Sequence, residues 1–402
     1  MRPHGLHRSL LVAALALLCL PGLAQAAEPT WLVGTSTGVA AAGSVPGTRI
    51  APGVRAVRGT TAAARRLSRL PGVRYVERNH RFHASSLSVP SDPLYSRQWA
   101  LRATNVRSAW LATLGDGVPV AVLDSGLDFS NPDLAGNVWT NPGEVRGNGL
   151  DDDGNGFVDD VHGADTVRYD GDPSDGFGHG TAVASVIASR GDNGFGLSGM
   201  AWNARLMPVK VLHDDGWGTT ATMIAGLDYA LDEGARIVNM SLNSSAPSQA
   251  LEEAIRRAAA RGVLVVSSAG NDGQNRDHVA SYPASERSSS VITVASANRA
   301  GGLARGSAFG RASVHIAAPG DDILTSDLGG RFTRRSGTSF AAAYVTGAAA
   351  LLAAAHPDAP GSRLRAALIA SSRRGGRVDA AVAGGELDAA AALQRLGRLR
   401  AR

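Results

Sequence analysis

Short apolar runs alternate with longer helical patterns along most of the chain. Runs of five or six residues rich in Val, Ile, Leu and Ala predict buried strands, and the longer stretches between them predict helices. Strands that alternate with helices are typical of an α/β fold with a mostly parallel sheet, in which chemistry gathers at the carboxyl ends of the strands. The predicted strands are residues 118–123, 206–211, 237–242, 263–268 and 291–295, and the predicted helices are 180–188, 219–233, 249–261 and 339–355, with one or two more after residue 357.

Residues 27–90 predict a small separate unit, with strands at 31–33 and 73–77 and a basic amphipathic helix at 61–70. About 60 residues without a disulfide form only a marginal core, so we expect this unit to need a partner surface. Its charge favours docking, because it carries nine Arg against two Glu, whereas residues 91–402 carry 29 basic and 33 acidic side chains. The formal charge of +5 therefore belongs to the N-terminal fifth and does not indicate a main body that binds nucleic acid.

Residues 1–26 have the pattern of a secretory signal peptide. Two arginines precede an apolar run at 10–20, and the segment ends in the small residues of 24–26. The run is too short to span a bilayer comfortably, so we expect no membrane span after its removal. A lipoprotein signal at Cys19, the one cysteine, is the alternative, but that signal needs a small residue where Leu18 stands.

Three short motifs carry the candidate chemistry, in the order Asp, His, Ser. Asp124 ends a predicted strand, His179 lies between glycines at a helix start, and Ser339 begins another helix. Each alone has a plainer interpretation as a turn, a loop residue or an N-cap. Together they have the parts of an acyl-transfer site, because a serine nucleophile needs a base and the base needs an orienting carboxylate. The helix start at Ser339 adds N–H groups for a developing oxyanion.

Six blocks in register, from about residue 91 to about 393, resemble the subtilisin-like serine proteases, the subtilases. The blocks are VAVLDSGLDFSNPDL at 120–134, HGTAVA at 179–184, IVNMSL at 237–242, SAGND at 268–272, AAPG at 317–320 and GTSFAAAYVTG at 337–347. The resemblance implies a three-layer α/β/α fold with a mostly parallel twisted sheet, preceded by a small α+β propeptide domain. It also implies a secreted serine endopeptidase that forms an acyl-enzyme and uses no catalytic cofactor.

Residue by residue, the resemblance makes Asp124 the carboxylate, His179 the general base and acid, and Ser339 the nucleophile. Asn271 would be the side-chain donor of the oxyanion hole; without the other three it would be read as a turn residue. Two edges would pair with an extended peptide and a third segment would line the specificity pocket. The edges are Gly216, Trp217 and Gly218 and Ser241, Leu242 and Asn243, and the pocket segment is Ser268, Ala269 and Gly270.

The chain departs from the family pattern near these positions. Asn243, followed by Ser244, stands where the family usually has Gly, so we expect its side chain to narrow or reshape the pocket and to oppose a broad preference for large apolar residues. Ala343 and Tyr344 replace the usual Pro and His. Both lie beyond the triad, so we expect them to tune packing and leave activity intact.

Residues 67–79 (LSRLPGVRYVERN) resemble the end of the inhibitory propeptide of the family. In that family the propeptide helps the catalytic domain to fold and blocks its site until cleavage. We therefore expect residues 27–90 to be a self-cleaved propeptide and residues 91–402 to be the peptidase, with the cut between about Phe82 and Ser91. A degenerate N-terminal domain without function is the alternative.

A chain that has lost residues 1–26 contains no cysteine, so bound metal would have to replace disulfides as a stabiliser. Residues 151–160 repeat the spacing of an EF-hand-like loop, with Gly156 at the sharp turn but His162 in place of the final Glu. Six to eight oxygens suit Ca²⁺; the alternative is a solvated acidic turn. The predicted ligands are the side chains of Asp151, Asp153, Asn155 and Asp159 and the carbonyl of Phe157.

A second calcium site follows from the resemblance alone. Asp133 and Asn193 match calcium ligands of the family, and Asp92 would close the site from the mature N-terminus. Backbone carbonyls near Gly191, Phe195 and Leu197 would join them.

The sequence thus predicts a secreted, calcium-stabilised, monomeric serine endopeptidase that acts on polypeptides, with its own propeptide as an intramolecular inhibitor. A catalytically silent relative that binds peptides in the same groove is the main alternative. A calcium-binding adhesion module would explain the acidic loop but not the triad. The preferred cleavage residue, and the choice between periplasm and medium, stay open.

Overall fold

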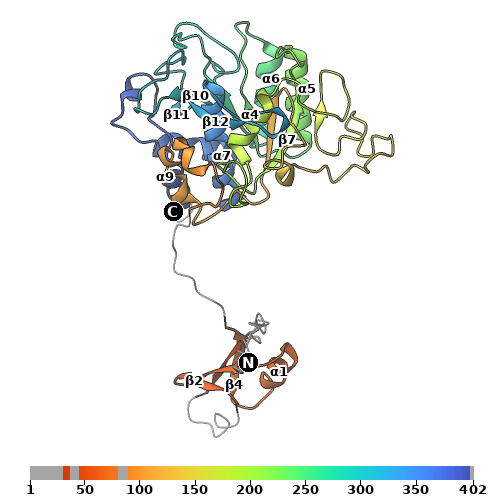
Figure 1. Ribbon diagram of the computed structural model, residues 1–402, viewed down its shortest axis with the longest axis vertical. Coiled ribbons are helices and arrows are strands. Elements are labelled where there is room, and N and C mark those ends of the chain that lie inside the picture. The colour runs from red at the N-terminus through yellow and green to blue at the C-terminus, as the bar shows by residue number, and fades with distance from the viewer. Residues whose placement is uncertain (1–29, 37–44, 80–88, 399–402) are drawn as a thin grey trace, which may run out of the picture. The chain divides into compact units, whose positions relative to one another are not determined.

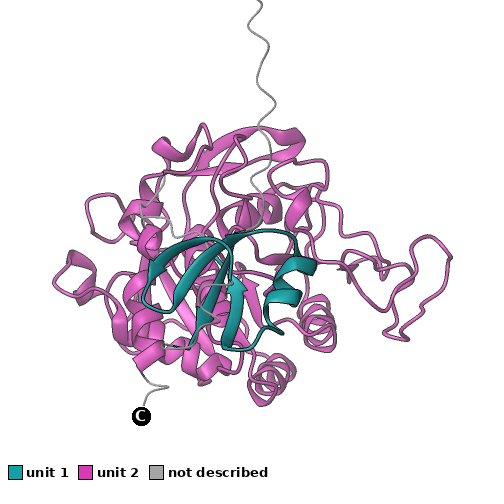
Figure 2. Ribbon diagram, turned by 90° about the horizontal axis from the view of Figure 1, so that it is seen from below, with its two compact units in different colours: residues 1–85 teal, residues 86–402 magenta. Residues whose placement is uncertain are grey.

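A computed structural model describes residues 30–36, 45–79 and 89–398. The predicted signal peptide and most of the predicted cleavage segment lie outside these residues. The chain divides into two compact units, residues 1–85 and 86–402, shown in different colours in Figure 2.

In its described residues, 30–36 and 45–79, the smaller unit has a four-stranded antiparallel sheet and one helix, with the strand order β2-β3-β1-β4. Val33, Val45 and Val57 form its small buried core. The predicted strands and helix are confirmed, but the β2–β3 hairpin was not predicted because every residue of β2 is exposed and shows no apolar alternation. The elements are β1 (Thr30–Thr35), β2 (Thr48–Ala51), β3 (Val54–Arg58), α1 (Thr61–Leu67) and β4 (Val73–Arg78).

The larger unit is built on a seven-stranded sheet with the order β11-β10-β9-β8-β5-β7-β6. Figure 1 labels β7, β10 and β11 of this sheet. Every neighbouring pair in this sheet is parallel. A separate antiparallel hairpin, β12–β13, precedes the helix that carries Ser339. The strands are β5 (Pro119–Asp124), β6 (Ala164–Asp165), β7 (Arg205–Lys210), β8 (Ile237–Met240), β9 (Leu264–Ser268), β10 (Val291–Ala297), β11 (Ile316–Pro319), β12 (Ile323–Ser326) and β13 (Phe332–Arg335).

Helices cover both faces of the large sheet, and alternate residues of each strand face opposite layers. Val120 and Val122 of β5 pack in one core with α4, α7, α8 and α9, whereas Ala121 and Leu123 pack in another with α5 and α6. The predicted three-layer α/β/α fold is confirmed. The helices are α2 (Trp99–Ala103), α3 (Val106–Ala109), α4 (His179–Ala188), α5 (Thr220–Asp232), α6 (Gln249–Ala260), α7 (Thr338–Ala355), α8 (Gly361–Ser371) and α9 (Ala389–Arg398).

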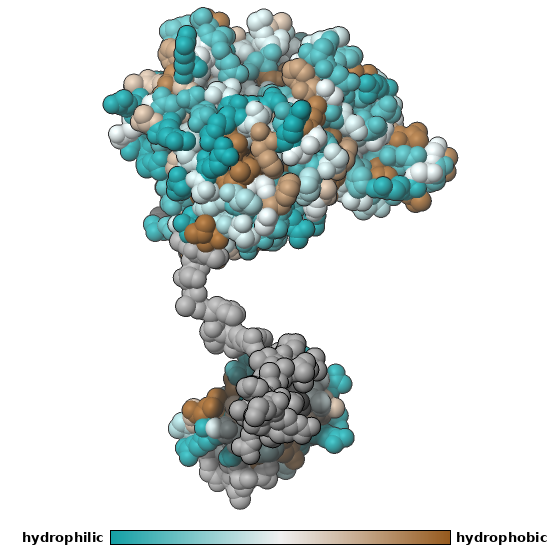
Figure 3. Space-filling model, in the orientation of Figure 1, coloured by the Kyte–Doolittle hydropathy of each residue, from teal (hydrophilic) through white to brown (hydrophobic). Residues whose placement is uncertain are grey.

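Helix α7 lies deep inside the larger unit, against α4 and strands β8 to β11. Among the described residues it is the one helix long and apolar enough to cross a membrane by length and composition, but 89% of it is buried inside the unit. On the side shown in Figure 3, hydrophobic side chains of this unit occur in small groups among hydrophilic ones. The apolar stretch of α7 is therefore part of the hydrophobic core of the unit.

The parallel sheet brings the candidate residues to one edge. Strand β5 ends at Asp124, and Ser241 and Asn271 closely follow the ends of β8 and β9. Helices α4 and α7 begin beside them with His179 and Ser339 in their first turns. The carboxyl ends of the strands thus carry the site, as expected for an open α/β sheet.

Candidate active site

The end of β5 and the start of α4 place a carboxylate against an imidazole. Asp124 is fully buried, and its Oδ1 and Oδ2 lie 2.7 and 2.9 Å from Nδ1 of His179. The N–H of Ser125 also donates to Oδ1, at 2.8 Å. Gly180 permits this close approach, because a Cβ there would lie 2.3 Å from the carbonyl oxygen of Gly126 and 3.2 Å from Cβ of Asp124.

The surroundings of His179 favour its protonated form. Burial of the ring opposes protonation, but the charge of Asp124 and its hydrogen bond outweigh burial and raise the pKa of His179 above its usual 6.5. The charge of Arg335 opposes this rise, and that of Asp175 adds to it. With the carboxylate at Nδ1, the neutral ring keeps its proton on Nδ1 and leaves Nε2 to accept another.

Ser339 is buried near the start of α7, with 5% of its surface exposed. Its hydroxyl donates to the carbonyl oxygen of Ser241 at 3.3 Å, and the Ser241 hydroxyl donates back to the carbonyl of Ser339 at 3.2 Å. Ser339, His179 and Asn271 line one cavity of about 610 Å³. Because the first N–H groups of a helix have no intrahelical acceptor, the Ser339 N–H adds a donor there.

Thr338, the residue before Ser339, fixes the side chain of Asn271 through two hydrogen bonds. Its Oδ1 accepts hydrogen bonds from the Thr338 N–H at 2.8 Å and the Thr338 hydroxyl at 3.0 Å. These bonds fix the amide plane, so that Nδ2 remains as a donor for the cavity that Asn271 lines. A hydrogen-bond donor of this kind suits a developing oxyanion.

The two predicted substrate edges line the same cavity, but the predicted pocket segment does not. Ser268, Ala269 and Gly270 are buried, and Asn243 lies across Ser268. Its Nδ2 donates to the Ser268 carbonyl at 3.0 Å, and the Ser268 hydroxyl donates to its Oδ1 at 3.1 Å. The Asn243 side chain, which stands in place of the family's Gly, is therefore held against Ser268 by two hydrogen bonds. Ser244, beside Asn243, also lines the cavity, and five further lining residues were not predicted: Phe177, Leu212, Thr219, Thr220 and Met223.

The subtilase family model matches residues 115–389, which include Asp124, His179, Asn271 and Ser339. The chain belongs to the subtilase family. It is a serine-type endopeptidase. Both expectations from the sequence are confirmed.

Relatives and solved structures agree with this assignment. A thermophilic serine proteinase of Bacillus sp. strain AK1 is 35% identical over 294 residues, which cover 73% of this chain and 66% of that protein. Thermitase of Thermoactinomyces vulgaris is 33% identical over 281 residues, which cover 70% of this chain and 90% of thermitase. A solved protease of Pseudoalteromonas arctica PAMC 21717 superposes with a TM-score of 0.65 at 28% identity, over 77% of this chain and 100% of that chain.

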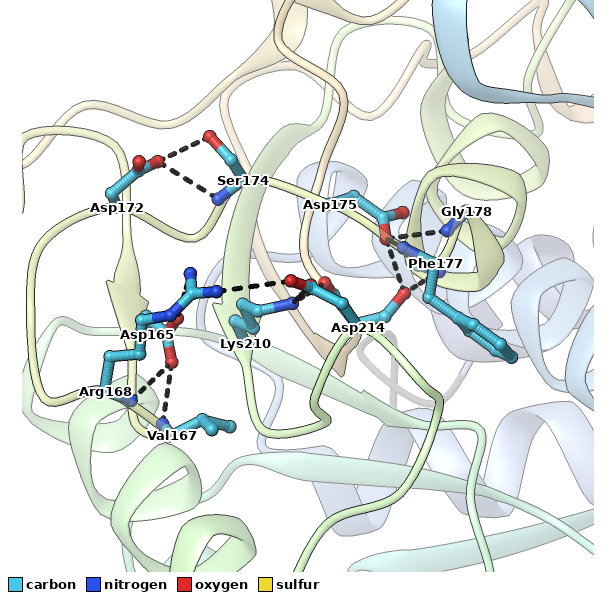
Figure 4. A network of polar contacts seen from close by, with 12 residues as sticks. Asp165, Val167, Arg168, Asp172, Ser174, Asp175, Phe177, Gly178, Lys210 and Asp214 are labelled. Carbon is cyan, nitrogen blue, oxygen red and sulfur yellow. Dashed lines mark hydrogen bonds and ion pairs between the residues drawn. The ribbon is translucent and has the colours of Figure 1, made fainter.

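In this subtilase a half-buried carboxylate that no motif indicated, Asp175, ties the loop before His179 to the end of β5. It accepts hydrogen bonds from the N–H groups of Phe177 (3.0 Å), Gly178 (2.7 Å) and Thr181 (2.9 Å), the first two of which are visible in Figure 4. The hydroxyls of Thr181 and Ser125 also donate to it, at 2.6 and 2.8 Å. Burial raises the pKa of Asp175, but these hydrogen bonds outweigh burial and lower it.

A buried lysine supports the same strand end from the neighbouring strand. Lys210 is the register partner of Asp124 and is 1% exposed. Its Nζ donates to the Ser125 carbonyl at 2.8 Å and to Asp214 at 2.7 Å. The hydrogen bond from Lys210 lowers the pKa of Asp214, which Arg168 also pairs at 3.2 Å (Figure 4). Both backbone groups of Ser125, the residue after Asp124, are thus hydrogen-bonded: its N–H to Asp124 and its carbonyl to Lys210.

The acidic loop of the subtilase gathers a different set of carboxylates from the predicted one. Glu144, Asp153 and Asp160 each place an oxygen within 4.8 Å of the others. Oε2 of Glu144 is buried and has no hydrogen-bond partner among the described residues. Burial raises the pKa of Asp160, and the charge of Asp153 adds to the rise. An orphaned carboxylate oxygen beside other carboxylates fits a hard cation such as Ca²⁺.

Of the predicted loop ligands, only Asp153 belongs to this cluster. Asn155 donates its Nδ2 to Asp153 at 3.2 Å and to Asp160 at 3.1 Å. Asp151 and Asp159 instead accept backbone N–H groups of residues 154–156 and 147–149. The Phe157 side chain packs in the core, and its carbonyl as a ligand stays a prediction. Glu144 and Asp160 were not predicted: Asp160 is fully buried, next to the positive-φ residue Asp159, and Glu144 lies outside the motif.

The residues of the second predicted metal site do come together. Asp133 accepts from Nδ2 of Asn193 at 3.2 Å and from the Leu197 N–H at 2.7 Å. Asp92 accepts from the N–H groups of Asp192 and Asn193, at 2.8 and 3.0 Å. Burial, with a contribution from the charge of Asp92, raises the pKa of Asp133 to about 6. No basic side chain in the described part of the chain pairs with either carboxylate, so this donor set also fits a cation.

Proposed function

We propose that this subtilase cleaves peptide bonds through an acyl-enzyme on Ser339. Its base and acid is His179, oriented by Asp124, and its oxyanion donors are Asn271 Nδ2 and the Ser339 N–H. One observation carries the proposal: an imidazole bonded at Nδ1 to a buried carboxylate lines the same cavity as the serine and the asparagine. An extended peptide would lie along the edges at residues 216–218 and 241–243.

The reaction follows from these positions. The Ser339 hydroxyl leaves its contact with Ser241 and gives its proton to Nε2 of His179 as Oγ attacks the substrate carbonyl carbon. The oxyanion accepts hydrogen bonds from Asn271 and the Ser339 N–H. His179 then protonates the leaving amine, the C–N bond breaks, and water releases the acyl group by the same proton transfers. Asp124 stays ionised throughout and stabilises the imidazolium.

The chain would be made as a secreted pre-pro-enzyme and act as a monomer. Residues 1–26 would direct export to the periplasm or the medium, residues 27–90 would inhibit the site until self-cleavage, and residues 91–402 would be the peptidase. Support comes from the separate core of the smaller unit and from its excess of Arg over acidic residues.

Calcium would be held at two places, each away from the proton transfers. One set is Glu144, Asp153 and Asp160, and the other is Asp92, Asp133 and Asn193. When bound, calcium would supply the positive charge that these carboxylates lack and join loop ends that are distant in sequence.

The proposal is tested by expressing the full chain beside Ser339→Ala, with Ser336→Ala as a matched control. Wild type and the control should lose about ten kilodaltons of N-terminal sequence and react with a fluorophosphonate; Ser339→Ala should do neither. If wild type keeps residues 27–90, and still fails to react after their removal by another protease, the chain is a peptide-binding relative without activity.

A further inference from the structure

A second cavity of the larger unit lies at the edge of the sheet opposite the active site. It measures about 570 Å³ and is lined by residues that directly precede β10 and β11 and by Arg365 of α8. Because the strands are parallel, the starts of β10 and β11 lie at the edge opposite the strand ends that carry the active site. No step proposed above uses this cavity.

Arg365 supplies this cavity with a fixed positive charge. Its Nε donates to the carbonyl oxygen of Val291 at 2.6 Å. Its two terminal nitrogens have no hydrogen-bond or ion-pair partner within residues 30–36, 45–79 and 89–398. Burial lowers the pKa of Arg365, as expected for a cation that no carboxylate compensates. A guanidinium held at Nε presents its remaining N–H groups as a fork that matches two oxygens of an anion.

His315 adds an uncharged donor beside this guanidinium. Its Nδ1 accepts a hydrogen bond from the Thr293 N–H at 2.8 Å, so the ring proton lies on Nε2. Burial, followed by the charge of Arg365, lowers the pKa of His315 to about 4, which keeps the ring neutral at neutral pH. The hydroxyl of Ser285, which also lines the cavity, accepts from the Ser281 N–H and keeps its own proton for a ligand.

The cavity also contains one carboxylate. Glu286 lines it but forms no ion pair with Arg365 or with the exposed Arg287 in the described structure. Burial raises the pKa of Glu286, and the charge of Glu252 adds to the rise, while Arg256 opposes it. An anion would therefore bind at the Arg365 and His315 end, and Glu286 would limit its affinity.

We propose that Arg365 and His315 bind a small oxyanion, either a free ion such as phosphate or sulfate or the carboxylate end of a short peptide. The guanidinium would take two oxygens and the Nε2–H of His315 a third contact. This binding does not depend on the protease chemistry, because the two cavities share no residue.

The test uses the full chain with Ser339→Ala, which removes autolysis. Thermal unfolding and calorimetric titration would be measured with sodium phosphate and sulfate against chloride at equal ionic strength. Acetyl-diglycine, with its amide as control, would test the peptide carboxylate. We expect saturable binding and a rising Tm. Arg365→Gln should weaken the binding by about tenfold or more, the usual loss for a charge-assisted hydrogen bond. Arg363→Gln, an exposed arginine on the same helix, should leave it unchanged.

Two further variants keep the test decisive if Arg365→Gln does not fold. His315→Asn keeps an acceptor for the Thr293 N–H but loses the Nε2 donor, so it should weaken anion binding. Glu286→Gln removes a like charge and should strengthen it. The proposal is overturned if phosphate, sulfate and the peptide acid act no differently from chloride or if Arg365→Gln binds as wild type does. It is also overturned if a cation binds instead and Glu286→Gln abolishes that binding.

Discussion

Asn271 depends on Thr338 for its orientation, since both hydrogen bonds to its Oδ1 come from that residue. The amide that would bind the oxyanion is thus fixed before substrate arrives. Preorganisation of this kind lets a donor act on the transition state more than on the bound substrate.

Asn271→Ala should therefore lower kcat by about 10²–10³-fold and change KM little. Steady-state kinetics on a peptide substrate would measure both constants. Gln274→Ala, an exposed neighbour outside the cavity, is the control. A large rise in KM with an unchanged kcat would show that Asn271 binds the substrate and does not stabilise the oxyanion.

With His179 as the proposed base, its raised pKa should set the acidic limit of activity. Catalysis needs the neutral ring, so kcat/KM should rise with pH through a pKa above 6.5. The charge of Arg335 opposes protonation of His179, so Arg335→Gln should move the acidic limb of the pH profile of kcat/KM to higher pH. Arg335 and Arg331 both pair with Asp327, at 3.0 and 3.9 Å, but Arg335 is the one whose charge opposes protonation of His179, so Arg331→Gln is the control. A limb that moves to lower pH in Arg335→Gln would contradict this assignment.

At the scale of elements, strands buried on both faces could be predicted because they form continuous apolar runs. Short or exposed elements such as β2, β6 and the β12–β13 hairpin have no such pattern. The positions of Asp124, His179 and Ser339 at one edge could be predicted because these residues stand beside strand or helix ends that the sequence marks. Glu144, Asp160 and Asp175 could not, because loop geometry alone decides which carboxylates meet.

The acidic loop offers a direct comparison between the two sets of calcium ligands. Glu144→Gln should remove the part of the calcium-induced rise in Tm that this loop site contributes, about 5 °C or more at a hundredfold excess over its Kd, and leave the part from the site of Asp92, Asp133 and Asn193. When a chelator has removed calcium, Glu144→Gln should be as stable as wild type or more stable, because the substitution removes a negative charge beside Asp153 and Asp160. Asp151→Asn is the matched variant and should keep the calcium response. The opposite result would restore the ligand set predicted from the sequence.

At the scale of the whole molecule, the two units carry opposite net charge. Residues 27–90 have nine Arg against two Glu, and residues 91–402 have four more acidic than basic side chains. Residues 27–90, produced separately, should therefore inhibit residues 91–402 in trans, as the proposed propeptide role requires. The inhibition constant should rise several-fold between 0.05 and about 0.5 M salt, because salt screens exposed charges. Inhibition independent of salt would show that apolar contacts dominate the docking.

Helix α7 has one more consequence, which concerns thermal inactivation. Nearly all of its residues are buried, and Ser339 lies in its first turn, inside the same core as α4 and the sheet. Partial opening of a protein begins where few apolar contacts are lost, and the start of α7 is no such place. On heating, the nucleophile should hence keep its position until the larger unit melts as a whole. Loss of activity and loss of circular dichroism should follow one common curve.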